Sequence, residues 1–263
     1  MTADSSSSLF SKTALSLGNT TVHIGFTSRA TGNLGLHVGS DPVRTLHHRA
    51  NLERELGLAT GAFCYLQQVH GTEVFDPDSY SVRSVGHRRT VESAQKIQRE
   101  APIADAAVSS QGHPLAVMVA DCIPLIFVGV TANGTPIIGV AHAGRRGLLD
   151  GVIEQTVGDM IYRGASEIDA WIGPSICGRC YEVPEPMREE SVALIPEIYA
   201  ETSWGTPALD LPAAAEAILN QLGKVGGVHR DLSDCTLENE NLFSHRRGLP
   251  EGRIAGLVWV EKP

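Results

Sequence analysis

Residues 114–144, "PLAVMVADCIPLIFVGVTANGTPIIGVAHAG", carry the densest strand signal of the chain. Short runs rich in Val and Ile are separated by Gly, Pro and the pair Asn133-Gly134, which is a typical hairpin turn. We therefore expect the strands on either side of this pair to run antiparallel. An acid and a thiol, Asp121 and Cys122, interrupt the apolar run, and burying a carboxylate without a partner is costly. This pair must have a structural or chemical reason.

Helices and strands mix on both sides of this stretch without strict alternation, which favours an α+β domain over a doubly wound one. Asp41 and Pro42 suit a helix start and Gly57 a helix stop. The pattern predicts helices over residues 41–57, 148–163, 187–195 and 212–222, and strands over 21–27, 168–173 and 253–260.

The chain of 263 residues suits one large domain or two small ones and is long enough for a real core. Residues 1–20, polar and rich in serine, are expected to form a flexible N-terminal tail, and residues 21–263 a single domain. Residues 76–101 are expected to form a long surface excursion, helical near "VESAQKIQRE".

Composition excludes several classes of partner. The net charge of −9 gives no basic excess for a nucleic-acid backbone. The longest apolar run, residues 115–130, is too short to span a bilayer, and no signal peptide is recognisable. Five scattered cysteines fit reduced thiols in the cytoplasm better than a disulfide framework. We therefore expect a cytoplasmic protein with small-molecule partners, no nucleic acid and no membrane, as a monomer or homodimer.

Three segments each place one metal-ligating side chain where the backbone leaves a predicted strand. These are His70 in "QQVHG", Cys122 in "ADCIP" and His142 in "VAHAG". Two imidazoles and one thiolate form a set that Zn²⁺ binds readily, with a fourth position left for water or substrate. The alternative is that the histidines are structural and the cysteine is an inert core residue. Spacing alone leaves both interpretations open.

The segments "YLQQVHGTEV", "ADAAVSS", "AVMVADCIPLIF", "GVAHAGRRGLLDGVIEQTV", "AWIGPSICGRCYEV" and "CTLENENLFSHRRGLPEGRIAGLVWV" resemble the YfiH-type laccase-domain family. With "NLGLHVG", residues 33–39, the resemblance runs from about residue 23 to the end. Members have been named polyphenol oxidases, peptidoglycan editing factors and purine nucleoside phosphorylases. The resemblance implies an α+β mixed-sheet sandwich with flanking helices, related to cysteine hydrolases of the cytotoxic necrotizing factor type.

For the site, the resemblance implies that His70, Cys122 and His142 are the catalytic residues and bind the metal. It implies zinc-dependent phosphorolysis of adenosine, inosine, guanosine and methylthioadenosine, with adenosine deamination alongside. Zinc is the expected metal, and copper is the alternative.

Phosphorolysis also requires an anion pocket, because phosphate must bind beside the reacting centre. The pairs Arg145–Arg146 and Arg246–Arg247 are candidates, since guanidinium groups bind phosphate bidentately. We predict that Arg146 and Arg246 bind phosphate and that Asn33 of "NLGLHVG" binds substrate. Solvated surface charge is the alternative for Arg145, Arg246 and Arg247.

Other acidic and thiol residues near these motifs have structural interpretations. Asp121 is interpreted as a pairing residue, with orientation of a ligand as the alternative. Asp105 is interpreted as a strand-entry residue, with orientation of a ligating histidine as the alternative. Cys177 and Cys180 form a Cys-x-x-Cys that we interpret as two incidental thiols. The segment "SVRSVGHRRTVES" is longer than the family pattern and is expected to cover the site.

The family pattern is altered at three positions: Arg145 replaces a Trp, His245 replaces a Tyr, and Cys177 stands where a Gly is common.

Rival functions remain open on the sequence. One is a metal-free cysteine hydrolase with Cys122 as nucleophile and His142 as base. Others are a copper-dependent polyphenol oxidase and a peptidoglycan precursor editing factor. The chain lacks the His-x-His clusters of multicopper oxidases, since its one close histidine pair is His47–His48 in a predicted helix. It also lacks the His-x-Glu and Pro-Cys-x-x-Cys motifs of ordinary zinc deaminases.

Overall fold

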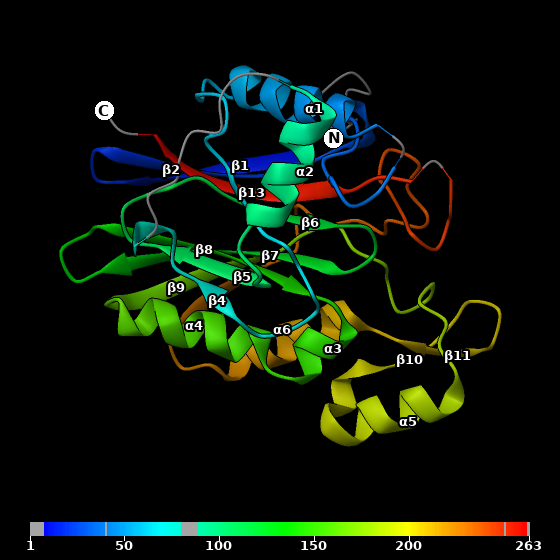
Figure 1. Cartoon of the computed structure of the whole chain (residues 1–263). Helices are drawn as coiled ribbons and strands as arrows, with labels where there is room; N and C mark the ends of the chain where they lie inside the picture. The colour runs from blue at the N-terminus through cyan, green and yellow to red at the C-terminus, as the bar shows by residue number, and fades with distance from the viewer. Residues whose placement is uncertain (1–7, 40, 80–88, 250, 262–263) are drawn as a thin grey trace.

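The computed structural model describes residues 8–39, 41–79, 89–249 and 251–261, in which two β-sheets pack face to face (Figure 1). The first sheet has, in spatial order, β1 (Leu9–Leu17), β2 (Thr20–Thr27), β13 (Ile254–Glu261), β6 (Leu115–Val119) and β3 (Cys64–Tyr65). The second has β12 (Val225–His229), β9 (Ala165–Ile172), β7 (Ile123–Thr131), β8 (Pro136–Ala143), β5 (Ala106–Ser109) and β4 (Val74–Phe75).

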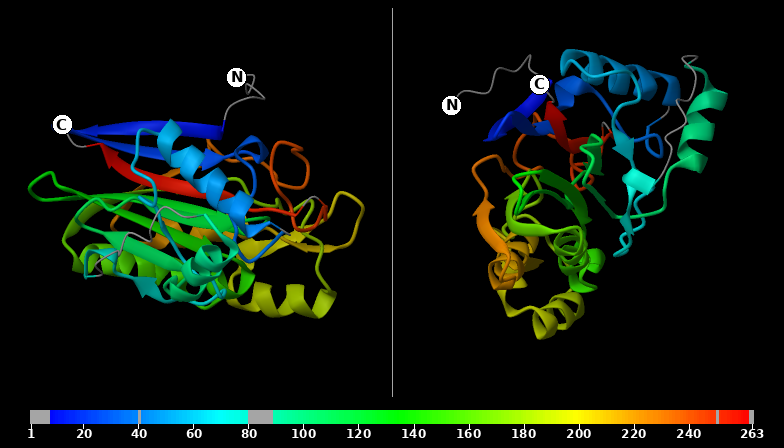
Figure 2. Two further views of the ribbon diagram at one scale, coloured as in Figure 1. Left: turned by 45° about the horizontal axis from the view of Figure 1, so that its top comes forward. Right: turned by 90° about the vertical axis from the view of Figure 1, so that its left-hand side faces the viewer.

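Helices cover the outer faces of both sheets, as Figures 1 and 2 show. The helices are α1 (Pro42–Glu55), α2 (Val91–Glu100), α3 (Arg145–Leu149), α4 (Val152–Tyr162), α5 (Glu185–Leu194) and α6 (Leu211–Gln221). A hairpin of β10 (Tyr199–Glu201) and β11 (Pro207–Leu209) lies beside α5, and short 3-10 turns occupy Arg29–Thr31, Pro77–Ser79 and Pro196–Ile198. Helix α1 packs on the first sheet, and α4 and α6 pack on the second.

The core between the sheets comes from the alternation of side chains along the strands. Ile24 and Phe26 of β2 point into this layer and meet Ile126 of β7 and Val140 of β8, all fully buried. Because side chains two apart in a strand share a face, the intervening residues of β7 and β8 pack outward against α4. Nearly continuous burial of β7 explains why its sequence has no polar alternation.

Strand directions are mixed, which confirms the expected mixed α/β architecture with sheets flanked by helices. Strands β7 and β8 are antiparallel around the Asn133-Gly134 turn, as predicted, whereas β12 pairs parallel with β9. No helix in the described ranges is long and apolar enough to cross a bilayer.

Two expectations were wrong. Residues 9–17 do not form a tail, because they are β1 and pair antiparallel with β2. The helix expected over 148–163 is two helices. Helix α3 begins earlier, at Arg145, and the helical backbone is interrupted at Gly151, which has a left-handed φ of 96° and precedes α4. The helix near "VESAQKIQRE" is confirmed as α2, but residues 80–88 of the polar excursion lie outside the described residues. Whether that excursion covers the site stays a prediction.

Asp78 joins the turn after β4 to the corner between β5 and β6. Its carboxylate accepts hydrogen bonds from Ser109 Oγ and Ser110 N–H, both at 2.6 Å, and from His113 Nδ1 at 3.0 Å. Burial raises the pKa of Asp78, but these hydrogen bonds outweigh burial and hold the pKa below its usual value. The carboxylate therefore stabilises the fold only when it is ionised.

We expect Asp78→Asn to lower the free energy of unfolding by about 1–3 kcal/mol near neutral pH, because a donor amide replaces an acceptor oxygen. A carboxyl whose folded pKa is lowered stabilises above its unfolded pKa of about 4, and this stability is lost as pH falls through the folded value. The difference between wild type and variant should therefore shrink below about pH 4. Urea unfolding at neutral and acidic pH measures it, and an equal loss at both would contradict the assignment.

Candidate metal centre

The structure brings His70, Cys122 and His142 together at one end of the two sheets. His70 lies in the loop between β3 and β4, Cys122 at the corner between β6 and β7, and His142 near the end of β8. His70 Nε2 lies 3.8 Å from Cys122 Sγ, and the two imidazole centroids are 4.7 Å apart. One ligand atom from each residue falls within 4.8 Å of the others. These three residues are called the triad below.

Asp105 connects two members of the triad. Its carboxylate is fully buried and accepts hydrogen bonds from the backbone N–H groups of Val69 (3.1 Å), His70 (2.9 Å) and Gly71 (2.7 Å). It also lies 2.8 Å from His142 Nδ1, which donates its proton to Asp105, so Nε2 is the nitrogen that would bind a metal. The interpretation of Asp105 as only a strand-entry residue was therefore wrong, since it orients a histidine.

Two non-glycine residues at the site have left-handed backbone. These are His70, with φ of 61°, and Asp121, with φ of 86°. Such residues persist when their surroundings over-determine them, and they cluster at functional sites. Asp121 accepts hydrogen bonds from Thr236 Oγ1 at 2.6 Å and from the Arg246 backbone N–H at 2.8 Å. The predicted pairing role of Asp121 is thus found, and it fixes the backbone that presents Cys122.

Gly144 allows the chain to pass close to the triad. A Cβ at this position would lie 2.7 Å from His70 Cδ2 and 3.0 Å from Cys122 Sγ, too close for any other residue without a shift. The glycine in "HAG" is therefore required by the approach of the β8–α3 turn to two ligands.

The triad and Asp105 form a coupled set of charges. Burial raises the pKa of the Cys122 thiol, but the neighbouring imidazoles of His142 and His70 outweigh it and lower that pKa. Burial lowers the pKa of His142, but Cys122 and then Asp105 outweigh it and raise that pKa. The site thus favours a thiolate, which is the form of cysteine that binds metals.

Three residues that sequence reasoning did not assign lie around the triad. Arg253 is partly buried and interacts electrostatically with Cys122, and His37 interacts with both Arg253 and His142. The phenol of Tyr181 also interacts with Cys122. His37 lies inside "NLGLHVG", which was noted only as a motif, whereas nothing in the local sequence marks Arg253.

The predicted phosphate ligands differ in their surroundings. Arg246 lies near the triad: its guanidinium stacks over Tyr181 at 4.9 Å and donates from Nη1 to the Glu182 carbonyl at 2.8 Å. Arg146 lies in α3 with its side chain 75% exposed, and its Nε is 3.5 Å from Asp150 of the same turn. The phosphate-binding roles of both arginines stay predictions.

The amide of Asn33 is used within its own loop. Its Nδ2 donates to the carbonyls of Gly35 and Val38 and to Thr45 Oγ1, and its Oδ1 accepts from the N–H groups of Gly35 and Arg253. This saturates the donor capacity of the amide. Substrate binding by Asn33 stays a prediction, and the structure shows a loop-stabilising role.

The donor set fits zinc. Imidazole nitrogen and thiolate sulfur bind zinc at about 2.0–2.3 Å, so two such ligands on one tetrahedral ion lie about 3.5 Å apart. The observed separation of 3.8 Å between His70 Nε2 and Cys122 Sγ is close to this value. Copper binds the same donors, so the identity of the metal belongs to the proposal below.

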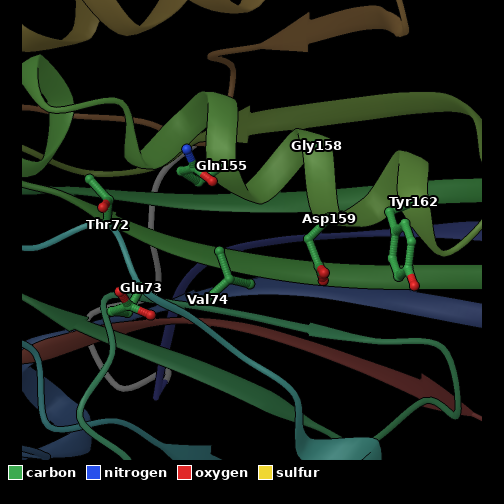
Figure 3. A pocket seen from close by; sticks show the side chains of 7 residues that line it. All are labelled: Thr72, Glu73, Val74, Gln155, Gly158, Asp159 and Tyr162. Atoms are coloured by element: carbon green, nitrogen blue, oxygen red, sulfur yellow. The ribbon is translucent and has the colours of Figure 1, made fainter.

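A separate open hollow lies between β4 and α4, as Figure 3 shows. Its volume is about 460 Å³, and it is lined by Thr72, Glu73, Val74, Gln155, Gly158, Asp159 and Tyr162. It contains none of the triad, and its two carboxylates and lack of cationic side chains disfavour phosphate. We therefore do not place a nucleoside or phosphate site there.

A two-sheet α/β fold with a histidine–cysteine–histidine cluster at the sheet ends defines a protein with a candidate mononuclear metal centre at that end. The family profile described as "Multi-copper polyphenol oxidoreductase laccase" matches residues 17–261. The chain belongs to this laccase-domain family, also known as the YfiH or DUF152 family. The expected resemblance is confirmed.

Two relatives with high coverage carry the same name. The chain is 39% identical over 252 residues to "Purine nucleoside phosphorylase ORF3" of Streptomyces griseus, covering 91% of this chain and 94% of that protein. It is 40% identical over 253 residues to a purine nucleoside phosphorylase of Streptomyces coelicolor, covering 91% and 96%.

Among solved structures, the Neisseria meningitidis DUF152 protein NMB0706 superposes with a TM-score of 0.71 at 29% identity, covering 95% of this chain and 99% of that one. Bacillus licheniformis YfiH gives the same TM-score at 23% identity, covering 90% and 92%, which shows a shared fold.

We expect Asp105→Asn to weaken zinc binding about 10–100-fold, because removing the partner of a ligating histidine has this effect in other metal sites. Competition against a chromophoric chelator measures the dissociation constant. Asp78→Asn is the matched control, since Asp78 also accepts a backbone hydrogen bond but contacts Ser109, Ser110 and His113 instead of the triad. Equal zinc affinity in Asp105→Asn and wild type would show that Asp105 does not tune the site.

Proposed function

We propose that the protein is a purine nucleoside phosphorylase that converts adenosine, inosine, guanosine or methylthioadenosine and phosphate to free base and the sugar 1-phosphate. The observation that carries this proposal is the shared name of relatives that are 35–40% identical over about nine-tenths of the chain. The triad supports the proposal, because an enzyme needs a catalytic site and these three residues could hold a metal ion.

In the proposed site, His70, Cys122 and His142 hold Zn²⁺. When bound there, zinc supplies a Lewis acid that polarises an oxygen and stabilises developing negative charge. Asp105 holds His142 and the His70 loop in place. We assign phosphate binding to Arg253 and Arg246, the two arginines near the triad, because guanidinium groups match phosphate oxygens.

The reaction balances without a redox partner. A phosphate oxygen bonds to C1′ of the sugar as the bond from C1′ to the base nitrogen breaks. The electron pair leaves with the base, which takes up a proton. Adenosine deamination, in which water replaces the amino group at C6, is the second reaction of the proposal and is measured separately.

The first test incubates metal-quantified protein with inosine, with and without phosphate. We expect hypoxanthine and ribose 1-phosphate only when phosphate is present. Adenosine is assayed in parallel, since inosine formed without phosphate reports deamination. Unchanged nucleosides under all conditions would contradict the proposal and favour a binding or peptidoglycan editing role.

We expect Cys122→Ala to lose zinc from the triad and to reduce inosine phosphorolysis more than about 100-fold, because a ligand and its charge are removed. Cys64→Ala is the control, since Cys64 lies in β3 with a pKa raised by burial to about 11 and has no place in the triad. Full activity of Cys122→Ala would remove the thiol from the mechanism.

Two variants test which arginine binds phosphate. We expect Arg253→Gln to raise the KM for phosphate about tenfold or more with zinc content unchanged, because Arg253 is a partly buried cation that interacts electrostatically with Cys122. Arg146→Gln should leave that KM nearly unchanged, since its side chain lies in solvent beside Asp150. The reverse pattern would restore the sequence-based assignment of phosphate to Arg146.

A second candidate is a metal-free cysteine hydrolase, and one observation favours it. Cys122, His142 and Asp105 form a thiol–imidazole–carboxylate series, with the imidazole held by the carboxylate at 2.8 Å. This arrangement suits a nucleophile and its base. The proposed kinship with hydrolases of the cytotoxic necrotizing factor type belongs to this candidate. Activity that survives chelation but is lost after alkylation of Cys122 would select it over the zinc enzyme.

Copper chemistry is the weaker candidate despite the name of the family. A multicopper oxidase needs several clustered histidines. Among the described residues, the triad is the only cluster of possible metal ligands that contains histidine, and it contains two. A mononuclear copper site at the triad is the form of this alternative that the residues allow.

We also propose that the protein is cytoplasmic, because its five cysteines are unpaired.

A further inference from the structure

A second group of ligating side chains lies outside the triad. Cys177 and Cys180 belong to the loop after β9, and Cys235 and Glu238 to the loop between β12 and β13. One ligand atom from each of the four lies within 4.8 Å of the others. We call these four residues the Cys₃Glu cluster. The interpretation of Cys177 and Cys180 as two incidental thiols did not include their partners from the distant loop.

The two halves of the cluster have the same spacing and similar turns. Cys177-x-x-Cys180 is closed by the Cys180 N–H donating to the Cys177 carbonyl at 3.0 Å. Cys235-x-x-Glu238 is followed by the Asn239 N–H donating to the Cys235 carbonyl at 2.9 Å. Structural zinc sites are typically built from such pairs, each pair on its own turn.

Backbone pairing brings the two turns together. Ser175 donates from its N–H to the Asp234 carbonyl, and Thr236 donates from its N–H to the Ser175 carbonyl, both at 3.1 Å. This short parallel bridge places Cys235 against the start of the Cys177 turn. The ligands are therefore brought together by main-chain geometry and do not depend on a chance meeting of flexible side chains.

Burial and distances suit a tetrahedral ion. Cys180 and Cys235 are 5% and 6% exposed and pack with Ile176, whereas the Glu238 carboxylate closes the solvent side with Oε1 3.4 Å from Cys180 Sγ. Sulfurs bound to one zinc at about 2.3 Å lie about 3.8 Å apart. The ligand atoms of the cluster all lie within 4.8 Å of one another, so small side-chain rotations would bring them to that separation.

We propose that Cys177, Cys180, Cys235 and Glu238 form a second metal site that binds Zn²⁺. Four protein ligands leave no open position, which is the arrangement of structural zinc sites and differs from the three-ligand triad. Three thiolates select zinc over magnesium or calcium, which prefer oxygen ligands. The bound ion joins the loop that carries Tyr181 to the loop that carries Thr236, the partner of Asp121.

The test counts metal in protein loaded with zinc and dialysed. Wild type should hold two zinc ions per chain, Cys122→Ala one, and Cys177→Ser/Cys180→Ser one. Cys64→Ser is the matched control and should keep two, because Cys64 belongs to neither group. No ion in Cys122→Ala, or the same count in Cys177→Ser/Cys180→Ser as in wild type, would overturn the proposal, whereas one wild-type ion that Cys122→Ala keeps would contradict only the metal site at the triad.

Cobalt distinguishes the two sites without an activity assay. Co²⁺ bound to the Cys₃Glu cluster has three thiolate ligands, and Co²⁺ at the triad has one. Cys122→Ala loaded with Co²⁺ should therefore retain the stronger sulfur-to-cobalt absorption, whereas Cys177→Ser/Cys180→Ser should retain only the weaker one. Loss of the strong absorption in Cys122→Ala would place it at the triad and contradict the proposal.

A further variant covers the case in which the double cysteine variant does not fold. Glu238 is exposed, so Glu238→Gln should fold and should weaken zinc at the cluster about 10–100-fold with the triad ion retained. Wild-type affinity for both ions in Glu238→Gln would remove the carboxylate from the site. A disulfide in the cluster would also overturn the proposal. It would be recognised by an intact mass two hydrogens below that of the fully reduced chain and by cluster thiols that resist alkylation.

Discussion

The buried carboxylate of Asp105 is the constraint on which the site depends. It accepts three consecutive backbone N–H groups, from Val69 to Gly71, and the imidazole proton of His142. One charge therefore fixes both the loop that joins β3 of the first sheet to β4 of the second and strand β8 of the second sheet. A buried carboxylate is tolerated only with such partners, and here the partners include two triad members, so stability and ligand geometry cannot be separated.

The face-to-face sheets explain why residues distant in sequence share this site. Strand β6 of the first sheet runs directly into β7 of the second through Asp121 and Cys122, so the corner lies where both sheets end. The turn at Gly144 then passes close enough to contact two ligands only because it lacks a side chain. The polar interruption in an otherwise apolar run is thus the crossing point between layers.

Much of this arrangement could be predicted from local sequence, and the exceptions have physical causes. The β7–β8 hairpin was predictable because Asn133-Gly134 specifies its turn. Strand β1 was not, because an edge strand with half-exposed polar residues looks like a tail until β2 pairs with it. Likewise, the triad was predictable from the family resemblance of its motifs, whereas the electrostatic interaction of Arg253 with Cys122 exists only because the fold brings the start of β13 near the β6–β7 corner.

The Cys₃Glu cluster and the triad are connected by a short series of hydrogen bonds. Cys235 precedes Thr236, whose hydroxyl donates to Asp121, and Asp121 holds the left-handed backbone that presents Cys122. Arg247 adds to this, because its guanidinium donates to the carbonyls of Leu237 and Asn239 within the same loop. A left-handed aspartate is retained only when its surroundings over-determine it. In the proposed arrangement, the structural ion supplies part of that constraint, so that the cluster stabilises the backbone on which the thiol of the triad is positioned.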